Sequence, residues 1–258
     1  MRHSFEQLKT TWAELGRVDP LWAVATREET RGGKWDLHEF CQTGEQDVAR
    51  YYQLLRTHGF CPSRLNHILD FGCGVGRLSV AWSSRAEFVT GVDISPSMIG
   101  KGQALLAGVK NVHLQVNEEP NLKCFPDAEF DLICSHICLQ HMAWPIAAGY
   151  LREFGRVCRP EGWVAFQLPA RQLTVISGSQ IRKKLVDLLP FGLDRVYRRW
   201  RRGCPVIFEM HYTRPLLVHQ TALESGLTEL HREPDRSAGE SIESFIYLFQ
   251  KKEAETPT

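Results

Sequence analysis

The sequence predicts an α/β fold built on a mostly parallel β-sheet, and three observations lead to this prediction. Short apolar runs alternate with longer helical stretches, which is the pattern of right-handed βαβ units with helices on both faces of a sheet. The first apolar run breaks into the glycine-rich turn Gly72-Cys73-Gly74-Val75-Gly76, and the second ends in the carboxylate of Asp93. A glycine turn followed by an acidic strand end indicates a nucleoside-containing cofactor at the carboxyl ends of the strands.

The first strand–helix–strand unit contains both of these motifs. The strand Ile68-Leu69-Asp70-Phe71 leads into the glycine turn, and a helix begins near Arg77. The second strand covers about residues 88–93. The next helix ends near Gly108, and its start is marked by Ser95 as the N-cap residue, followed directly by a proline.

The central part of the chain continues the alternation. Strands are expected at 112–116 and 131–135, a helix at about 144–158, and a fifth strand at 163–168. The residues Arg159-Pro160-Glu161-Gly162 are expected to form a turn between this helix and the fifth strand, because Pro and Gly both favour turns.

The end of the chain changes character. A helix is expected from Pro215 to Gly226, followed by strands at about 227–233 and 244–250. The polar loop between these strands is too short for a crossover helix, so they are expected to pair antiparallel. The last residues, 253–258, have the composition of a disordered tail.

Composition fits a single-domain enzyme, and the overall charge does not point to nucleic acid or a membrane. The chain has 258 residues, of which 43% are hydrophobic and 24% are charged, and 31 Lys and Arg against 30 Asp and Glu give a net charge of +1. The N-terminus lacks the apolar core of a signal peptide, and no apolar run is long enough to span a bilayer. These features predict a cytoplasmic location.

The cysteines do not indicate a metal site. None of the eight forms a C-x-x-C pair, so the ligand spacing of a structural zinc site is missing and no metal is expected. Free thiols in a reducing compartment are the better interpretation. The cysteines are Cys41, Cys61, Cys73, Cys124, Cys134, Cys138, Cys158 and Cys204.

The glycine spacing discriminates between cofactors. A dinucleotide fingerprint, G-x-G-x-x-G, would need its third glycine where Arg77 stands, which disfavours a nicotinamide oxidoreductase. Glycines at 72, 74 and 76, with an acid at Asp70, resemble motif I of the class I S-adenosylmethionine (SAM) methyltransferases. The resemblance runs from about His67 to the end of the chain. It implies a Rossmann-like, doubly wound sheet of seven strands that ends in an antiparallel hairpin.

The resemblance also assigns residues to the methionine part of SAM. The backbone at Gly72, Cys73 and Gly74 is expected to face it, and Ser135, at the tip of the fourth strand, is expected beneath its amine. Arg77 could pair with the cofactor carboxylate, although a surface helix arginine is an equally good interpretation.

The nucleoside part is assigned in the same way. Asp93 is expected to hold the ribose hydroxyls, with Ile94 and Met98 against the adenine. Related enzymes commonly place an Asp after the third strand to accept from the adenine amino group, and here Asn117 and Glu118 stand there. The Asn117 side-chain oxygen can accept that hydrogen bond.

The segment Ser135–Met142 resembles the acceptor-side segment of methyltransferases that act on small molecules. It lacks the Asn/Asp-Pro-Pro-aromatic motif of the amino-methylating nucleic-acid enzymes. His141 is the candidate general base for an acceptor hydroxyl, with a helix-capping or backbone-bonded histidine as the alternative. His136 and His211 are weaker candidates.

The methyltransferase domain is expected at 65–252, and two segments lie outside its common core, one before the domain and one inserted within it. Residues 1–64 are helical and rich in tryptophan, and they either cap the cofactor or cover one edge of the sheet. Residues 171–205 are expected to form a lid over the acceptor. Five arginines in 195–202, preceded by the basic run 182–184, could attract an anionic or carrier-linked acceptor or a membrane surface. A solvated helix face is the alternative, and nucleic acid is disfavoured.

These observations predict a SAM-dependent methyltransferase that acts on oxygen or nitrogen of a small-molecule acceptor and releases S-adenosylhomocysteine. The alternatives are an RNA methyltransferase and a non-catalytic SAM-binding partner protein. An amine or thiolate acceptor would need no general base.

Overall fold

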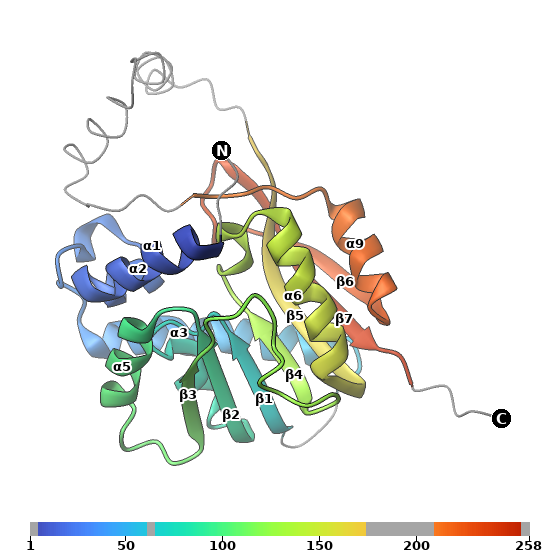
Figure 1. The fold of residues 1–258 in the computed structure, drawn as a ribbon, viewed down its shortest axis with the longest axis horizontal. Coiled ribbons are helices and arrows are strands. Elements are labelled where there is room, and N and C mark those ends of the chain that lie inside the picture. Colours follow the sequence, from blue (N-terminus) through green and yellow to red (C-terminus); the bar gives the residue numbers. More distant parts are fainter. Residues whose placement is uncertain (1–4, 61–64, 174–208, 254–258) are drawn as a thin grey trace.

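The structure is a computed structural model that describes residues 5–60, 65–173 and 209–253. Its centre is a seven-stranded sheet with the order β3-β2-β1-β4-β5-β7-β6 (Figure 1). The first five strands pair in parallel, and β7 pairs antiparallel with both β5 and β6. The predicted fold, with its terminal antiparallel hairpin, is therefore confirmed.

The helices and strands predicted from the first glycine turn onward all form, with boundaries that shift by a few residues. The strands are β1 (Leu65–Phe71), β2 (Ala86–Asp93), β3 (Val112–Val116), β4 (Phe130–Ser135), β5 (Cys158–Gln172), β6 (Leu227–Asp235) and β7 (Ile242–Lys251). The α-helices are α1 (Phe5–Val18), α2 (Pro20–Val24), α3 (Leu37–Thr57), α4 (Arg77–Trp82), α5 (Pro96–Leu105), α6 (Trp144–Val157) and α9 (Pro215–Glu224). Single-turn 3-10 helices lie at η1 (Glu28–Thr30) and η2 (Leu139–His141).

The turn expected at 159–162 is instead an irregularity inside β5. Phe130 of β4 pairs with Cys158, but Leu132 already pairs with Trp163, so β5 advances five residues while β4 advances two. Glu161 adopts a φ of 60° at this point. The proline and glycine therefore bend the strand locally without ending it.

The N-cap expected for α5 is present. The Ser95 hydroxyl accepts a hydrogen bond from the backbone N–H of Met98 at 3.3 Å, and Pro96 is the first helical residue. This bond satisfies one of the N–H groups that have no partner within the helix. It also fixes the helix directly behind Asp93, the last residue of β2.

Each face of the sheet is covered by its own layer of helices. On one face, Phe71 and Phe166 pack in a core with Phe154 of α6 and Val218 of α9. On the other face, α3 and α4 bury their side chains against β1 and β4, with Trp82 of α4 fully buried. Figure 1 shows α6 and α9 in front of the sheet.

The N-terminal helices have two different locations. Helix α3 packs on the sheet, whereas α1 and α2 lie across one end of the strands (Figure 1). Helix α1 is joined to α5 by two hydrogen bonds, in which Ser95 donates to the Trp12 carbonyl at 3.0 Å and Ser97 donates to the Ala13 carbonyl at 2.7 Å. The segment thus covers both a sheet face and the start of α5.

Most of the predicted lid and its arginine cluster lie outside the described residues. Residues 171 and 172, which begin the lid interval, are the end of β5. Within the described part of the chain, no helix has the length and apolar character needed to cross a membrane.

Candidate active site

A cavity of about 370 Å³ lies at the carboxyl ends of the parallel strands. Its walls come from the glycine turn after β1, the end of β2, the loop after β4, helices α1 and α2, and the turn between β6 and β7. Ligand sites in open α/β sheets are found at this edge. The cavity brings together most of the residues that the sequence assigns to the cofactor.

The glycine turn forms the wall beneath α2 and the loop after β4. Gly72 and Gly74 have φ values of 75° and 55°, a region that favours glycine. A Cβ atom on Gly72 would lie 2.1 Å from the Cys138 sulfur, and one on Gly74 would lie 2.4 Å from Val24. The backbone is therefore in direct contact with both neighbouring segments, and only glycine fits at either position.

We expect Gly72→Ala to lower the free energy of unfolding by about 1–3 kcal/mol, because a side chain at positive φ is strained and the new methyl group overlaps Cys138. Chemical denaturation measures this change. Gly100→Ala is the matched control, since Gly100 lies in α5 at ordinary φ and a methyl group there would meet no atom within 4 Å among the described residues. A Gly72 variant as stable as the control would contradict the packing described above.

Asp93 stands at the end of β2 with both carboxylate oxygens oriented by backbone groups. One oxygen accepts from the N–H of Gly74 at 2.9 Å, and the other accepts from the N–H of Ser95 at 2.9 Å. Each oxygen keeps a further lone pair. Removal from water raises the pKa of Asp93 to about 6, although these hydrogen bonds oppose the increase.

Asp70 lies at the other side of the glycine turn and is only 2% exposed. Its carboxylate accepts a hydrogen bond of 2.6 Å from the hydroxyl of Ser79 in α4. Burial raises the pKa of Asp70 to about 6, with the Ser79 bond acting in the opposite direction. Asp70 thus ties the end of β1 to the helix that follows the glycine turn.

The residues predicted to surround the adenine divide into two groups. Ile94, Met98 and Asn117 line the cavity. The Asn117 amide donates to the Asn121 carbonyl at 2.8 Å, which leaves its side-chain oxygen to accept from a ligand. Glu118, in contrast, is absent from the cavity wall and forms a 2.8 Å ion pair with Lys9, so its predicted cofactor contact is not supported.

Arg77 lines the cavity but is not the surface residue considered as one interpretation. It is 5% exposed and donates to Asp47 at 2.6 Å and to Thr43 at 3.0 Å, both on α3. Its Nε is buried with no hydrogen-bond partner among the described residues.

Ser135 and Cys73 differ in their positions around the glycine turn. Cys73 lines the cavity, as expected, whereas Ser135 is completely buried and does not. The wall beyond β4 is formed instead by the next residues, His136, Ile137 and Cys138. β4 ends at Ser135, as the sequence indicated, but the cavity wall begins only with the residue that follows it.

His141 lines the cavity and is 4% exposed. Its Nδ1 lies 2.8 Å from the Glu209 carbonyl, which can only accept, so Nδ1 carries the proton and Nε2 carries the lone pair. The Gln140 amide nitrogen lies 3.2 Å from Nε2. Burial lowers the pKa of His141 to about 4, and the ring is neutral at pH 7. The Trp12 ring packs edge-on against the His141 ring, with 5.0 Å between the ring centroids.

The weaker histidine candidates have different surroundings. His136 lines the cavity and lies between Tyr51, 3.1 Å from Nδ1, and Asp47, 3.5 Å from Nε2. Burial lowers its pKa to about 4 as well. His211 is not in the cavity wall, and its backbone N–H donates to the Gln140 carbonyl at 2.7 Å.

Several wall residues were not predicted from the sequence. Gln140, Tyr150 and Met210 line the cavity, as do Ser237, Ala238 and Gly239 from the β6–β7 turn. No motif marks them. Only the position of Gln140 beside His141 offered a signal, because the two residues share one turn of η2.

Comparison with known proteins identifies the family. The model of the family described as "Methyltransferase domain" matches residues 68–162. A ubiquinone biosynthesis O-methyltransferase of Paracidovorax citrulli is 30% identical over 187 residues, which covers 70% of this chain and 75% of that protein. The chain belongs to the class I SAM-dependent methyltransferases. It is therefore an enzyme with SAM as its cofactor, as the glycine spacing indicated.

Other similar proteins are matched over a smaller or more distant region. The chain spans about half of the same-named Pseudomonas fluorescens enzyme, with 30% identity over 48% of this chain and 54% of that protein. Among solved structures, magnesium protoporphyrin IX methyltransferase from Synechocystis has a TM-score of 0.65 at 16% identity, covering 96% of this chain and all of the other. A Pyrococcus horikoshii protein has a TM-score of 0.59 at 20% identity, covering 93% and 99%. These structures support the fold.

Proposed function

We propose that this methyltransferase transfers the methyl group of SAM to a hydroxyl oxygen of a small-molecule acceptor. The observation that supports this most directly is His141, a neutral imidazole in the wall of the same cavity as Asp93 and the glycine turn. The name of the Paracidovorax relative, an O-methyltransferase of ubiquinone biosynthesis, favours oxygen over nitrogen. The same relative favours a small acceptor over RNA and an enzyme over a non-catalytic SAM-binding protein.

The cofactor is proposed to lie along the β1–β2 side of the cavity. Asp93 would accept from the ribose hydroxyls, and Asn117 from the adenine amino group, with Met98 against the ring. The backbone at Gly72 and Gly74 would face the methionine part. These residues share one wall, and the lone pairs left on the Asp93 carboxylate and the Asn117 oxygen support this placement.

Arg77 completes the proposed cofactor site. Its buried Nε has no partner among the described residues, so a methionine carboxylate would satisfy an N–H that otherwise costs free energy. The 2.6 Å ion pair with Asp47 holds the guanidinium in place. Arg77 would thus bind the carboxylate while remaining attached to α3.

SAM supplies an electrophilic methyl group, so the largest contribution of the protein is to align acceptor oxygen, methyl carbon and sulfur. Such alignment supplies about 7–11 kcal/mol of the barrier reduction in favourable cases. The acceptor is proposed to lie against Trp12, Met142 and Met210, which give the cavity an apolar wall near His141. These side chains exclude water from the reacting atoms.

The test is a binding and turnover experiment on the intact chain. Calorimetry with SAM, S-adenosylhomocysteine and NAD should show binding of the first two only. Transfer of radioactive methyl from SAM to a panel of phenols, alcohols, amines and thiols should then favour the hydroxyl compounds. Binding of NAD alone, or turnover restricted to amines or thiols, would overturn the proposal.

We expect SAM affinity to depend on pH because of Asp93. Its pKa of about 6 in the free protein means that the carboxylate is ionised above pH 6 and protonated below. Ribose hydroxyls donate better to the ionised form, so affinity should rise from pH 5 to pH 7 and then level off, by up to about tenfold per unit below the pKa. Calorimetry across this range measures it, with Asp93→Asn expected to have a weaker dependence. An equal dependence in that variant would exclude Asp93 as the source.

A cytoplasmic location and an anionic or carrier-linked acceptor are further parts of the proposal. The location is supported by the cysteines among the described residues, all six of which are free thiols. The acceptor class is supported by the five arginines of residues 195–202, which lie outside the described part of the chain.

A further inference from the structure

The turn between β6 and β7 contributes a cavity wall on the half of the sheet that lies away from Asp93. β6 and β5 both pair antiparallel with β7, so β6 runs parallel to β5 and ends at the same edge as β1 and β2. Strands β1, β4, β5 and β7 separate it from β2 (Figure 1). Ser237, Ala238 and Gly239 of this turn line the cavity. The proposed cofactor site and this turn therefore lie on opposite halves of the sheet edge.

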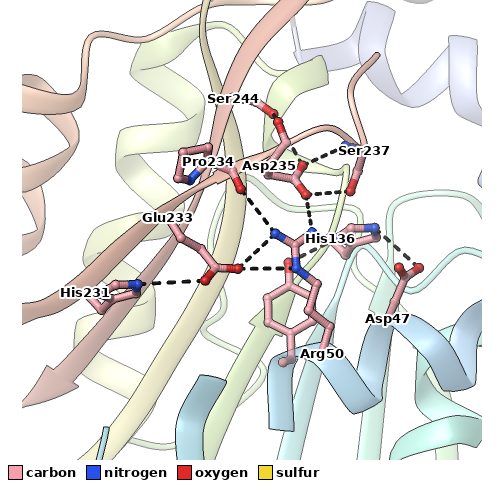
Figure 2. Close-up of polar contacts among 10 residues, drawn as sticks. Asp47, Arg50, His136, His231, Glu233, Pro234, Asp235, Ser237 and Ser244 are labelled. Atoms are coloured by element: carbon pink, nitrogen blue, oxygen red, sulfur yellow. Dashed lines mark hydrogen bonds and ion pairs between the residues drawn. The ribbon is translucent and has the colours of Figure 1, made fainter. Parts of the chain in front are cut away.

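A buried carboxylate organises the turn from within. The Asp235 side chain is completely buried, and it accepts from the Ser237 N–H at 2.9 Å and from the Ser237 hydroxyl at 2.8 Å. The Ser244 hydroxyl, at the start of β7, lies 3.3 Å from it (Figure 2). Asp235 thus links both ends of the turn through one side chain.

Arg50 of α3 supplies the charge that this buried carboxylate requires. Its Nη1 donates to Asp235 at 2.6 Å, while Nη2 and Nε donate to Glu233 at 2.9 and 3.3 Å. Figure 2 shows the guanidinium reaching from the helix to the last residues of β6. A buried carboxylate without such a cation would be strongly unfavourable, so Arg50 holds the end of β6 against α3.

Helix α3 also contacts residues on the opposite side of the cavity. Asp47, one turn before Arg50, pairs with Arg77 at 2.6 Å and lies 3.5 Å from His136 (Figure 2). Arg77 and His136 both line the cavity. Helix α3 therefore sets the distance between the β6–β7 turn and the wall that follows β1 and β4.

We propose that the β6–β7 turn, residues 236–241, is the acceptor-binding wall of the cavity, and that Arg50 is the positioning residue that fixes it through Asp235. This inference rests on the proposed function for the identity of the second substrate. The glycine turn and Asp93 account for the cofactor half, which leaves the turn to face the acceptor. Ala238 and Gly239 offer it little side-chain bulk, so the size of residue 238 sets how large an acceptor can enter.

The direct test is Ala238→Phe, with the hydroxyl compound that the wild-type enzyme methylates fastest as the acceptor. We expect the acceptor KM to rise at least tenfold while S-adenosylhomocysteine binds within twofold of wild type by calorimetry. Loss of S-adenosylhomocysteine binding would place the turn at the cofactor, and an unchanged KM would remove it from the acceptor site. Either result overturns the inference.

Three variants test the role of Arg50: Arg50→Met, Arg50→Lys, and a double variant that combines Arg50→Met with Asp235→Asn. The double variant removes both charges of the Arg50–Asp235 pair, so no unpaired Asp235 carboxylate is left buried. We expect a higher acceptor KM with kcat and S-adenosylhomocysteine affinity nearly unchanged, and partial rescue by lysine. Hydrogen exchange should also accelerate at residues 236–244, where backbone bonds such as Ile242 N–H to the Gly239 carbonyl, 3.1 Å, now protect the turn.

Arg171→Met is the matched control, because it removes the exposed ion pair with Glu243 on the neighbouring strands and neither residue lines the cavity. Unchanged exchange and an unchanged KM in the double variant would overturn the role of Arg50. If the wild-type enzyme methylates no hydroxyl compound, the proposed function fails. Even then, two measurements still test whether Arg50 fixes the β6–β7 turn and whether the turn lies away from the cofactor. These are the hydrogen exchange of the Arg50 variants and the S-adenosylhomocysteine affinity of the Ala238 variant.

Discussion

Asp93→Ala should weaken the binding of SAM and S-adenosylhomocysteine by about 10²–10⁴-fold. Hydrogen bonds to a charged acceptor contribute about 1.5–3 kcal/mol each, and the two ribose hydroxyls would lose one each. The N–H groups of Gly74 and Ser95 orient the two Asp93 oxygens, and each oxygen keeps a lone pair for a ribose hydroxyl in the proposed complex. Calorimetry at pH 7.5 measures the effect, since the carboxylate is then ionised.

Glu118→Ala is the control for this measurement. Glu118 is also an acid near the end of a strand, but it pairs with Lys9 outside the cavity, so its removal should change SAM affinity less than twofold. Circular dichroism and thermal unfolding establish that the Asp93 variant is folded. A folded Asp93 variant with wild-type affinity would show that the ribose is bound elsewhere.

Local chemistry explains why the glycine turn and the Asp93 end of the cavity could be predicted. The glycines at 72 and 74 are required by their own φ values, and Asp93 follows from the end of a buried strand. Ser95 and Pro96 determine where α5 begins. Each of these signals lies within a few residues of the structure that it specifies, so no tertiary information is needed.

The errors and omissions came from side-chain direction and from long-range contacts. Asn117 and Glu118 follow β3 directly, but Asn117 lines the cavity while Glu118 pairs with Lys9, a difference in direction that the sequence does not indicate. The ion pair of Arg50 with Asp235 joins residues 185 positions apart, so no local pattern could indicate it. The same holds for Arg77, whose partner Asp47 lies on another helix.

The structure also changes how His141 can be expected to act. A histidine with a pKa of about 4 is a weak base, so it cannot deprotonate a hydroxyl before the methyl group moves. The hydroxyl proton becomes strongly acidic as the new C–O bond forms, and even a weak base can accept it at that point. The acceptor hydroxyl must first displace the Gln140 amide, which lies 3.2 Å from Nε2.

His141→Ala should therefore lower kcat by about 10²–10⁴-fold while SAM affinity stays within twofold of wild type. The variant removes Nε2, the ring nitrogen that carries the lone pair, because Nδ1 donates to the Glu209 carbonyl. Initial-rate assays at saturating concentrations of SAM and acceptor measure kcat. In the wild-type enzyme, the pH profile of kcat should show no loss of activity near pH 6.5 attributable to His141, since the neutral form persists down to about pH 4.

His141→Asn separates a catalytic role from a structural one. An asparagine amide can replace the Nδ1–H that donates to the Glu209 carbonyl, but it offers no basic nitrogen. If His141 is a general base, this variant should be as slow as His141→Ala. If His141 is purely structural, the variant should recover activity. His219→Ala, which removes a contact between α9 and Glu229 of β6 outside the cavity wall, should leave kcat unchanged. Full activity in both His141 variants would mean that the acceptor needs no base, and an amine or thiol would then become the favoured nucleophile.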